Sequence, residues 1–172
     1  AVYYPHRDTW YGHPQSLITW WLPLDDLSEE ESFCFYPERF DVPVPNSSER
    51  FDYDDWIAKG WDLKIGWQNI RSGVEADYPG VIGEPDRGRE VGFSCERGEN
   101  LLFSGAQFHA TRPQSLSRSR FSLDFRIVDV IDEAAGIGAP QVDVRAKGSA
   151  LAEIPVGESL GVRVDLHSAS TL

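Results

Sequence analysis

The feature that most constrains the fold of this chain is the alternation of apolar and polar residues over 117–130 (SRSRFSLDFRIVDV). Side chains of a β-strand point alternately to opposite faces, so this pattern predicts a strand with one apolar and one polar face. The apolar face comprises Phe121, Leu123, Phe125 and Ile127, and the polar face comprises Arg120, Ser122, Asp124 and Arg126. An apolar face of this size is rarely left exposed, so we expect something to cover it.

Other short segments are also typical of strands, because they are rich in β-branched, aromatic and other apolar residues and end at turn residues. The run 16–24 (SLITWWLPL) is almost continuously apolar, which predicts burial on both faces. A hairpin is predicted over 89–105, turning at 97–100. The remaining predicted strands are 1–8, 32–38 and 106–114. Many short strands with few helices predict an all-β fold, a sandwich or a jelly roll (double-stranded β-helix).

Two regions depart from this regular pattern. Residues 40–88 mix Pro, Gly, charges and the tryptophans Trp56, Trp61 and Trp67, with one or two helical turns near FDYDDWIAKGW. We interpret them as a long insertion in a core spanning 1–130, because a structureless loop of this length is uncommon and is usually functional. Residues 131–172 form a C-terminal extension that could add strands.

The length, charge and cysteine content limit the classes of protein to which this chain can belong. The 172 residues suffice for one domain with its own core, and a net charge of −12 disfavours nucleic acid and anionic membranes as partners. No apolar run approaches the roughly 18–20 residues of a membrane helix. Only Cys34 and Cys95 are present, which suggests reduced thiols and a cytoplasmic protein.

The candidate chemistry lies in His6-Arg-Asp8 and in the distant His109. On a strand, residues two apart share a face, so His6 and Asp8 would point the same way. With His109 alongside they would form a 2-His-1-carboxylate triad, which holds iron(II) on one side and leaves the other positions open.

Two rival interpretations are weaker. A protein-kinase catalytic loop also contains HRD, but the asparagine that should follow the aspartate by five positions is His13, and no glycine-rich loop or DFG is present. A zinc site lacks C-x-x-C spacing, and His13 and His167 are poorly placed to complete one.

Two stretches together carry a resemblance to a known family. They are HRDTWYGHPQSLITWWLPLDDLSEEESFCFYPERF and GENLLFSGAQFHATRPQSLSRSRFSLDFR, which cover roughly residues 4–40 and 95–128. In order, they resemble the H-x-D, tryptophan strand, acidic turn, H-x-T and R-x-S pattern of the phytanoyl-CoA dioxygenase-like Fe(II)/2-oxoglutarate-dependent oxygenases.

The resemblance implies roles for individual residues. His6, Asp8 and His109 would be the iron ligands. Arg120, eleven positions after His109, would bind the distal carboxylate of the cosubstrate 2-oxoglutarate, with Thr111 beside it and Trp21 lining the pocket. Alternation alone does not separate Arg120 from Arg118 or Arg126, or Trp21 from its neighbour Trp20. Arg126 could instead be a structural residue that pairs with Asp124 or another acid, and His13 could contact substrate.

The resemblance further implies hydroxylation of a small molecule with release of succinate and carbon dioxide. The insertion at 40–88 would then be the substrate lid, unless its tryptophans simply pack it onto the barrel. Members of the family usually carry N-terminal helices that pack on the outer face of the sheet, and no such helices precede His6 here. We therefore expect a preceding segment or another chain to cover that face. Two other functions remain open, a cupin-like metal enzyme that does not use 2-oxoglutarate and a non-catalytic jelly-roll binding module.

Overall fold

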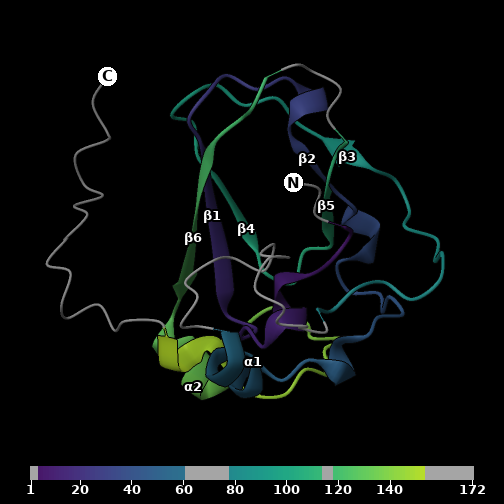
Figure 1. Cartoon of the computed structure of the whole chain (residues 1–172), viewed down its shortest axis with the longest axis vertical. Helices are drawn as coiled ribbons and strands as arrows, with labels where there is room; N and C mark the ends of the chain where they lie inside the picture. The colour runs from purple at the N-terminus through teal and green to yellow at the C-terminus, as the bar shows by residue number, and fades with distance from the viewer. Residues whose placement is uncertain (1–3, 61–77, 114–117, 154–172) are drawn as a thin grey trace, which may run out of the picture.

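The computed structural model describes residues 4–60, 78–113 and 118–153, which fold into two facing antiparallel sheets (Figure 1). One sheet has the order β4-β1-β6, with β1 at Leu17–Pro23, β4 at Leu101–Ser104 and β6 at Ser122–Val128. The other has the order β3-β2-β5, with β2 at Phe33–Phe35, β3 at Val91–Gly92 and β5 at His109–Thr111. The expectation of an all-β fold agrees with this architecture.

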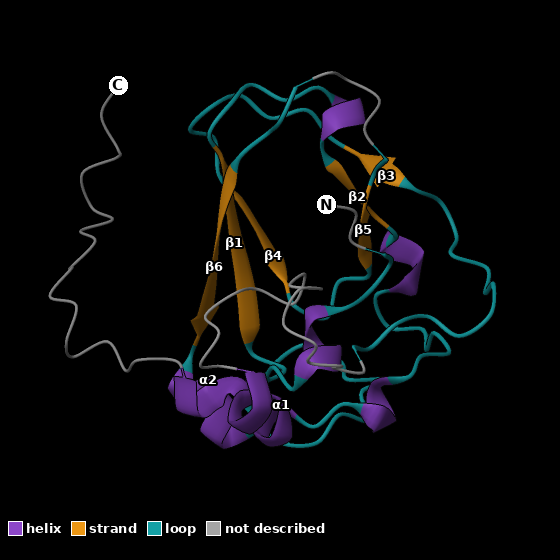
Figure 2. Ribbon diagram, in the orientation of Figure 1, coloured by secondary structure: helices purple, strands orange, loops and turns teal. Residues whose placement is uncertain are grey.

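The helices are short and gather mainly at one end of the sandwich (Figure 2). Helix α1 spans Tyr53–Gly60, inside the segment for which helical turns were predicted. Helix α2 spans Val130–Ala135 and was not predicted. Six residues are too few to display a period, but the Asp129 side chain caps this helix by accepting hydrogen bonds from two backbone N–H groups. The short 3-10 helices are η1 (Asp8–Tyr11), η2 (Glu29–Glu31), η3 (Pro37–Arg39), η4 (Ser48–Arg50) and η7 (Ala150–Glu153).

Strand β1 is the centre of the larger sheet, and its burial corrects one prediction. Its side chains alternate, with Leu17, Thr19 and Trp21 buried toward the other sheet, while Ile18 and Trp20 are more than a third exposed. The prediction that both faces are buried was therefore wrong. The second sheet covers only one side of β1, which leaves the apolar residues of the other parity uncovered.

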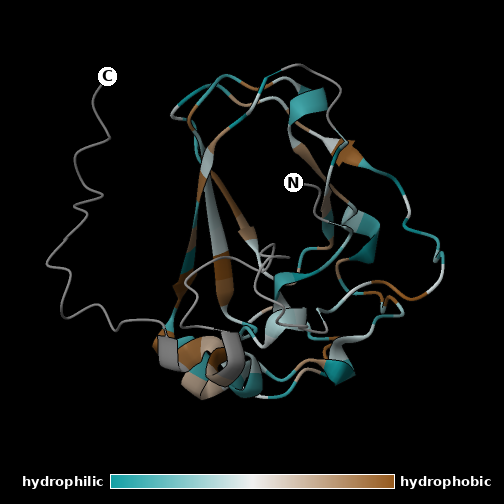
Figure 3. Ribbon diagram, in the orientation of Figure 1, coloured by the Kyte–Doolittle hydropathy of each residue, from teal (hydrophilic) through white to brown (hydrophobic). Residues whose placement is uncertain are grey.

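The outward face of the β4-β1-β6 sheet carries an exposed apolar surface. Leu102 of β4 is 57% exposed and Phe125 of β6 is 46% exposed. The ribbon of this sheet is coloured as hydrophobic along β4 and along parts of β1 and β6 (Figure 3). We call this set the outer apolar face: Ile18, Trp20, Leu102, Phe121, Leu123, Phe125 and Ile127. The alternation in β6 was thus predicted correctly, and the elements within the described ranges leave its apolar side open.

Two further local predictions were wrong. The predicted strand 1–8 does not continue to Asp8, because His6 forms a single antiparallel bridge with His109 and the chain then turns into η1. The predicted hairpin at 89–105 is a crossover between sheets: β3 pairs with β2, and β4 pairs with β1. The chain does turn at Arg97-Gly98, where the Glu99 N–H donates to the Glu96 carbonyl at 3.0 Å, but the strands on either side of the turn pair with other strands.

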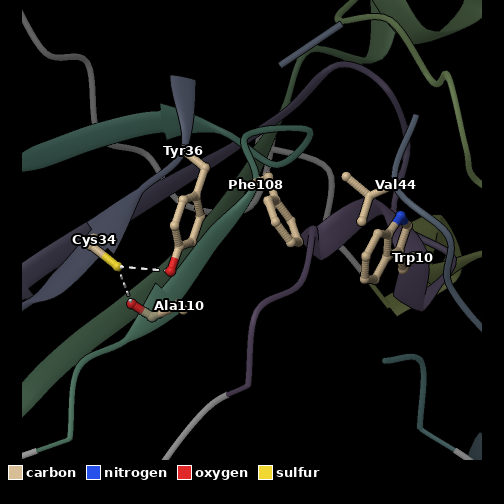
Figure 4. Packing of buried hydrophobic residues seen from close by; sticks show 6 residues of the cluster. All are labelled: Trp10, Cys34, Tyr36, Val44, Phe108 and Ala110. Carbon is tan, nitrogen blue, oxygen red and sulfur yellow. Dashed lines mark hydrogen bonds between the residues drawn. The ribbon is translucent and has the colours of Figure 1, made fainter. Parts of the chain in front are cut away.

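The core is divided between the two sides of the smaller sheet. Between the sheets lie Trp21, Phe33 and Cys95, surrounded by further phenylalanines. On the far side of β2 and β5, Cys34 and Tyr36 pack in a second cluster with Trp10, Val44, Phe108 and Ala110 (Figure 4). Both cysteines are buried free thiols.

Part of the C-terminal extension packs against the insertion. Asp52 and Lys147 form a parallel bridge, and the Tyr53 N–H donates to the Lys147 carbonyl at 2.9 Å. The additional strands predicted near 152–166 lie almost entirely outside the described residues. Within the part of the chain that the structure describes, no helix has the length and apolar character needed to span a membrane.

Candidate metal centre

Two histidines far apart in sequence are fixed opposite each other by backbone hydrogen bonds. The His6 N–H donates to the His109 carbonyl at 2.9 Å, and the His109 N–H donates back at 3.0 Å. Directly opposed residues of an antiparallel pair place their side chains on the same face. The two imidazole rings accordingly lie with their centroids 4.4 Å apart.

Asp8 joins these histidines from the first position of η1. Its carboxylate is buried, and its Oδ1 lies 3.5 Å from His6 Nε2. One ligand atom from each of His6, Asp8 and His109 can be chosen so that all three lie within 4.8 Å of one another. The structure therefore brings the predicted triad together, although a tight turn rather than a strand places the carboxylate.

The backbone orients both imidazoles. His6 Nδ1 lies 2.7 Å from the Tyr4 carbonyl, and His109 Nδ1 lies 2.9 Å from the Gln107 carbonyl. A carbonyl oxygen only accepts, so each Nδ1 carries the proton and each Nε2 keeps its lone pair in the neutral ring. This is the tautomer that a metal-binding histidine uses when its other nitrogen is held by a carbonyl.

The charges of the cluster also suit a cation. Burial opposes ionisation of Asp8, but Arg126 and the two histidines hold the pKa of its carboxyl well below the ordinary value. Burial, together with the neighbouring His6, lowers the pKa of His109 to about 4. At neutral pH the site therefore presents a carboxylate and an uncharged imidazole at His109.

The triad forms part of the wall of a cavity of about 230 Å³ between the two sheets. Arg120, Trp21 and Thr111 line the same cavity, and the Arg120 guanidinium lies over the Trp21 ring, 5.9 Å from its centroid. The other lining residues are Thr19, Phe33, Phe103, Ser122, Asp124 and Arg126.

The structure separates the candidates that the sequence left open. Arg118 pairs with Glu31 at 2.6 Å and is absent from the cavity wall. Arg126 lines the cavity close to the triad, with Nη2 3.5 Å from Asp8 Oδ2, and it also pairs with Asp124. Trp20 belongs to the outer apolar face, where its indole N–H donates to Asn100.

The remaining candidates lie elsewhere. His13 is absent from the cavity wall and packs near Tyr53, with ring centroids 6.3 Å apart. The Trp56 indole N–H donates to the Tyr78 hydroxyl at 2.9 Å, in a cluster around α1, as expected of a tryptophan that packs the insertion. Trp61, Trp67 and His167 lie outside the described residues.

Sequence reasoning missed Thr19 as a partner of Asp8, whereas it named Arg126 as a residue that could pair with an acid. The Thr19 hydroxyl donates to Asp8 Oδ2 at 2.5 Å, and Arg126 approaches the same oxygen. A signal for Thr19 existed, because it is a polar residue in an apolar strand and has the same parity as Trp21. Its partner could not be identified from that signal.

Together the fold and the site define an all-β protein with a buried His-Asp-His cluster that could hold a metal ion. The chain matches no protein-family model, and no curated protein matches it.

Proposed function

We propose that this protein is an Fe(II)/2-oxoglutarate-dependent oxygenase that hydroxylates a C–H bond of a small molecule. The observation that carries the proposal is the shared cavity, whose wall contains the His6-Asp8-His109 cluster and, beside it, Arg120 stacked on Trp21. The proposal includes a jelly-roll interpretation of the two sheets, with the triad between them.

The donor set fits iron(II). Two imidazole nitrogens and one carboxylate oxygen form a facial triad, which suits iron(II) and leaves further coordination positions open. Both histidines have their Nδ1 held by carbonyls, which leaves each Nε2 as the ligand atom, and the Asp8 carboxyl is held in its ionised form. When bound, iron and 2-oxoglutarate supply the oxidative chemistry, which no side chain of this site supplies itself.

Arg120 is the proposed anchor for the cosubstrate. A guanidinium can donate two parallel hydrogen bonds to one carboxylate, and stacking on Trp21 restricts its plane. Thr111 lines the same cavity and has the same strand parity as His109, so its hydroxyl is available to the same carboxylate. These groups orient a dicarboxylate with its other end toward the triad, while Phe33 and Phe103 exclude water.

The test is decarboxylation of 2-oxoglutarate labelled at its C1 carboxylate, measured as released carbon dioxide with iron(II) and oxygen. We expect turnover by the wild type and an increase of at least tenfold in KM for 2-oxoglutarate in Arg120→Ala. Arg118→Ala is the matched control, because Arg118 is two residues away and pairs with Glu31 outside the cavity. Asp8→Ala should abolish turnover.

The outcomes separate the competing functions. Metal binding with turnover that is indifferent to Arg120 would refute the cosubstrate assignment. Metal binding without any consumption of 2-oxoglutarate would favour a cupin-like metal enzyme. Failure of the wild type to bind any divalent metal would favour a binding module with a vestigial triad.

A further inference from the structure

The two oxygens of the Asp8 carboxylate have different surroundings. Oδ1 faces the triad, 3.5 Å from His6 Nε2. Oδ2 accepts the Thr19 hydroxyl at 2.5 Å and lies 3.5 Å from Arg126 Nη2. The side chain is almost fully buried, so water does not compete strongly for either oxygen.

The partners of Oδ2 come from one rigid unit. Thr19 of β1 and Arg126 of β6 are directly opposite each other in a register that pairs all seven residues of β1 with β6. Both side chains point into the cavity. Thr19 is 2% exposed, and its β-branched side chain has few rotamers available. The position of its hydroxyl is therefore determined by the sheet.

We propose that Thr19 and Arg126 clamp Oδ2 so that Asp8 presents Oδ1 alone to the metal. They are positioning residues for the metal centre, and the inference rests on the metal centre of the proposed function. A carboxylate can bind a metal through one oxygen or through both. Binding through both would occupy a further coordination position, whereas the clamp keeps that position available for a second ligand.

The geometry favours this role over ordinary satisfaction of a buried hydroxyl. A buried threonine can satisfy its hydroxyl on a nearby backbone carbonyl, as such side chains commonly do. Thr19 instead donates to the one carboxylate of the triad, which belongs to a different segment. Arg126 brings its charge to the same oxygen and also pairs with Asp124, another residue of the cavity wall, so the guanidinium is held by two carboxylates.

The chain contains a matched control. Thr9 is adjacent to Asp8 and fully buried, yet its hydroxyl has no hydrogen-bond partner among the described residues. Thr9→Val and Thr19→Val therefore make the same isosteric change, one hydroxyl to one methyl, in equally buried surroundings. Only Thr19→Val removes a donor from the carboxylate. Thr19→Ser restores the donor while it removes the methyl group.

The experiment uses cobalt(II) as a probe, because the intensity of its visible absorption differs between five- and six-coordinate centres. Affinity is measured in parallel by competition with a chelator. We expect Thr19→Val to change the absorption intensity and to weaken cobalt(II) binding by about 10–100-fold, the usual effect of losing an outer partner of a ligand. Thr19→Ser should recover most of both, and Thr9→Val should match the wild type. Arg126→Met should shift the absorption in the same direction as Thr19→Val.

Equal spectra and equal affinities for Thr19→Val and Thr9→Val would overturn the clamp. So would a Thr19→Ser variant that behaves like Thr19→Val, because then the methyl group, not the hydroxyl, would matter. Should Thr19→Val not fold, as judged by circular dichroism, Thr19→Ala is compared with Thr19→Ser, because these two variants both lack the methyl group and differ only in the hydroxyl. A wild type that binds no cobalt(II) would overturn the metal centre itself, and the clamp with it.

Discussion

Arg7, the residue between the candidate ligands His6 and Asp8, is expected to dominate the stability of this fold. The Arg7 side chain is 1% exposed and lies beside the Asp143 carboxylate, with Nε 3.2 Å from Oδ2. Burial lowers the pKa of Arg7, and the attraction of Asp143 opposes that shift. The guanidinium also donates to four backbone carbonyls, those of Arg39, Phe40, Val42 and Ala106.

The cost of Arg7→Met follows from these contacts. Methionine keeps much of the apolar stem but removes every donor. Breaking a buried ion pair from one side costs about 3–5 kcal/mol, because the remaining carboxylate loses its partner. Asp143 keeps two other hydrogen-bond donors, Trp10 and Val44, so we expect the cost of breaking the ion pair to lie at the lower end of that range. Carbonyls that lose their donor add about 1 kcal/mol or more. We expect a total of about 4–6 kcal/mol, a large part of the roughly 5–15 kcal/mol that stabilises a domain.

A double-mutant cycle tests the source of that cost. The free energy of unfolding is measured by urea titration, followed by tryptophan fluorescence, for Arg7→Met, Asp143→Asn and the double variant. The two losses should not add, and a coupling of about 2 kcal/mol is expected for contacting charges. Arg145→Met is the control, because its exposed pair with Glu49 should be worth less than about 1 kcal/mol. A loss below about 1 kcal/mol in Arg7→Met, or strict additivity, would refute the reasoning.

Three further predictions concern other parts of the molecule. The hydrogen bond from Arg118, followed by that from the Ser28 backbone, lowers the pKa of Glu31 from 4.5 to about 2. The stability from this shift is present above pH 4.5 and is lost as the pH falls toward 2, so the Tm advantage of wild type over Glu31→Gln should shrink between pH 5 and 2; a constant advantage would contradict this. Leu123→Lys and Phe125→Lys should reduce light scattering by concentrated protein with little change in Tm, because both residues are more than 40% exposed, and a large fall in Tm would show that they are covered. Saturating cobalt(II), at about 100 times Kd, should stabilise the wild type by about 2.7 kcal/mol in urea unfolding and leave Asp8→Ala unchanged; equal stabilisation of both would place the metal elsewhere.

The residues of the candidate site were predicted from the sequence more accurately than the local structure around them. His6, Asp8 and His109 are in proximity as predicted. The strand predicted through Asp8 failed because the conformation there depends on tertiary contacts, notably the donation from Thr9 N–H to the Gly105 carbonyl. The triad was predicted from residue types that can bind a metal, so an error in the predicted backbone conformation at Asp8 did not affect that prediction.

Properties that depend on pairing between distant segments could not be predicted from the sequence. Alternation correctly divided β6 into two faces, but it could not show that Trp21 faces inward and Trp20 outward, because β1 is apolar on both parities. The contact between Arg126 and Asp8 likewise depends on the register of β1 with β6. A one-residue slip would have placed a different side chain opposite Thr19.

The candidate metal centre depends on residues of both sheets. His109 lies on β5 and packs against the aromatic rings of Phe33 and Phe103, whereas the groups that hold Asp8 lie on β1 and β6. The distance between the His109 and Asp8 ligand atoms therefore depends on how the sheets pack, as well as on the backbone bridge between His6 and His109. Removing volume between them, as in Phe33→Ala, would change ligand spacing without altering any ligand. By the same coupling, a bound metal would hold the two sheets together and stabilise the fold, so metal affinity and core packing should vary together.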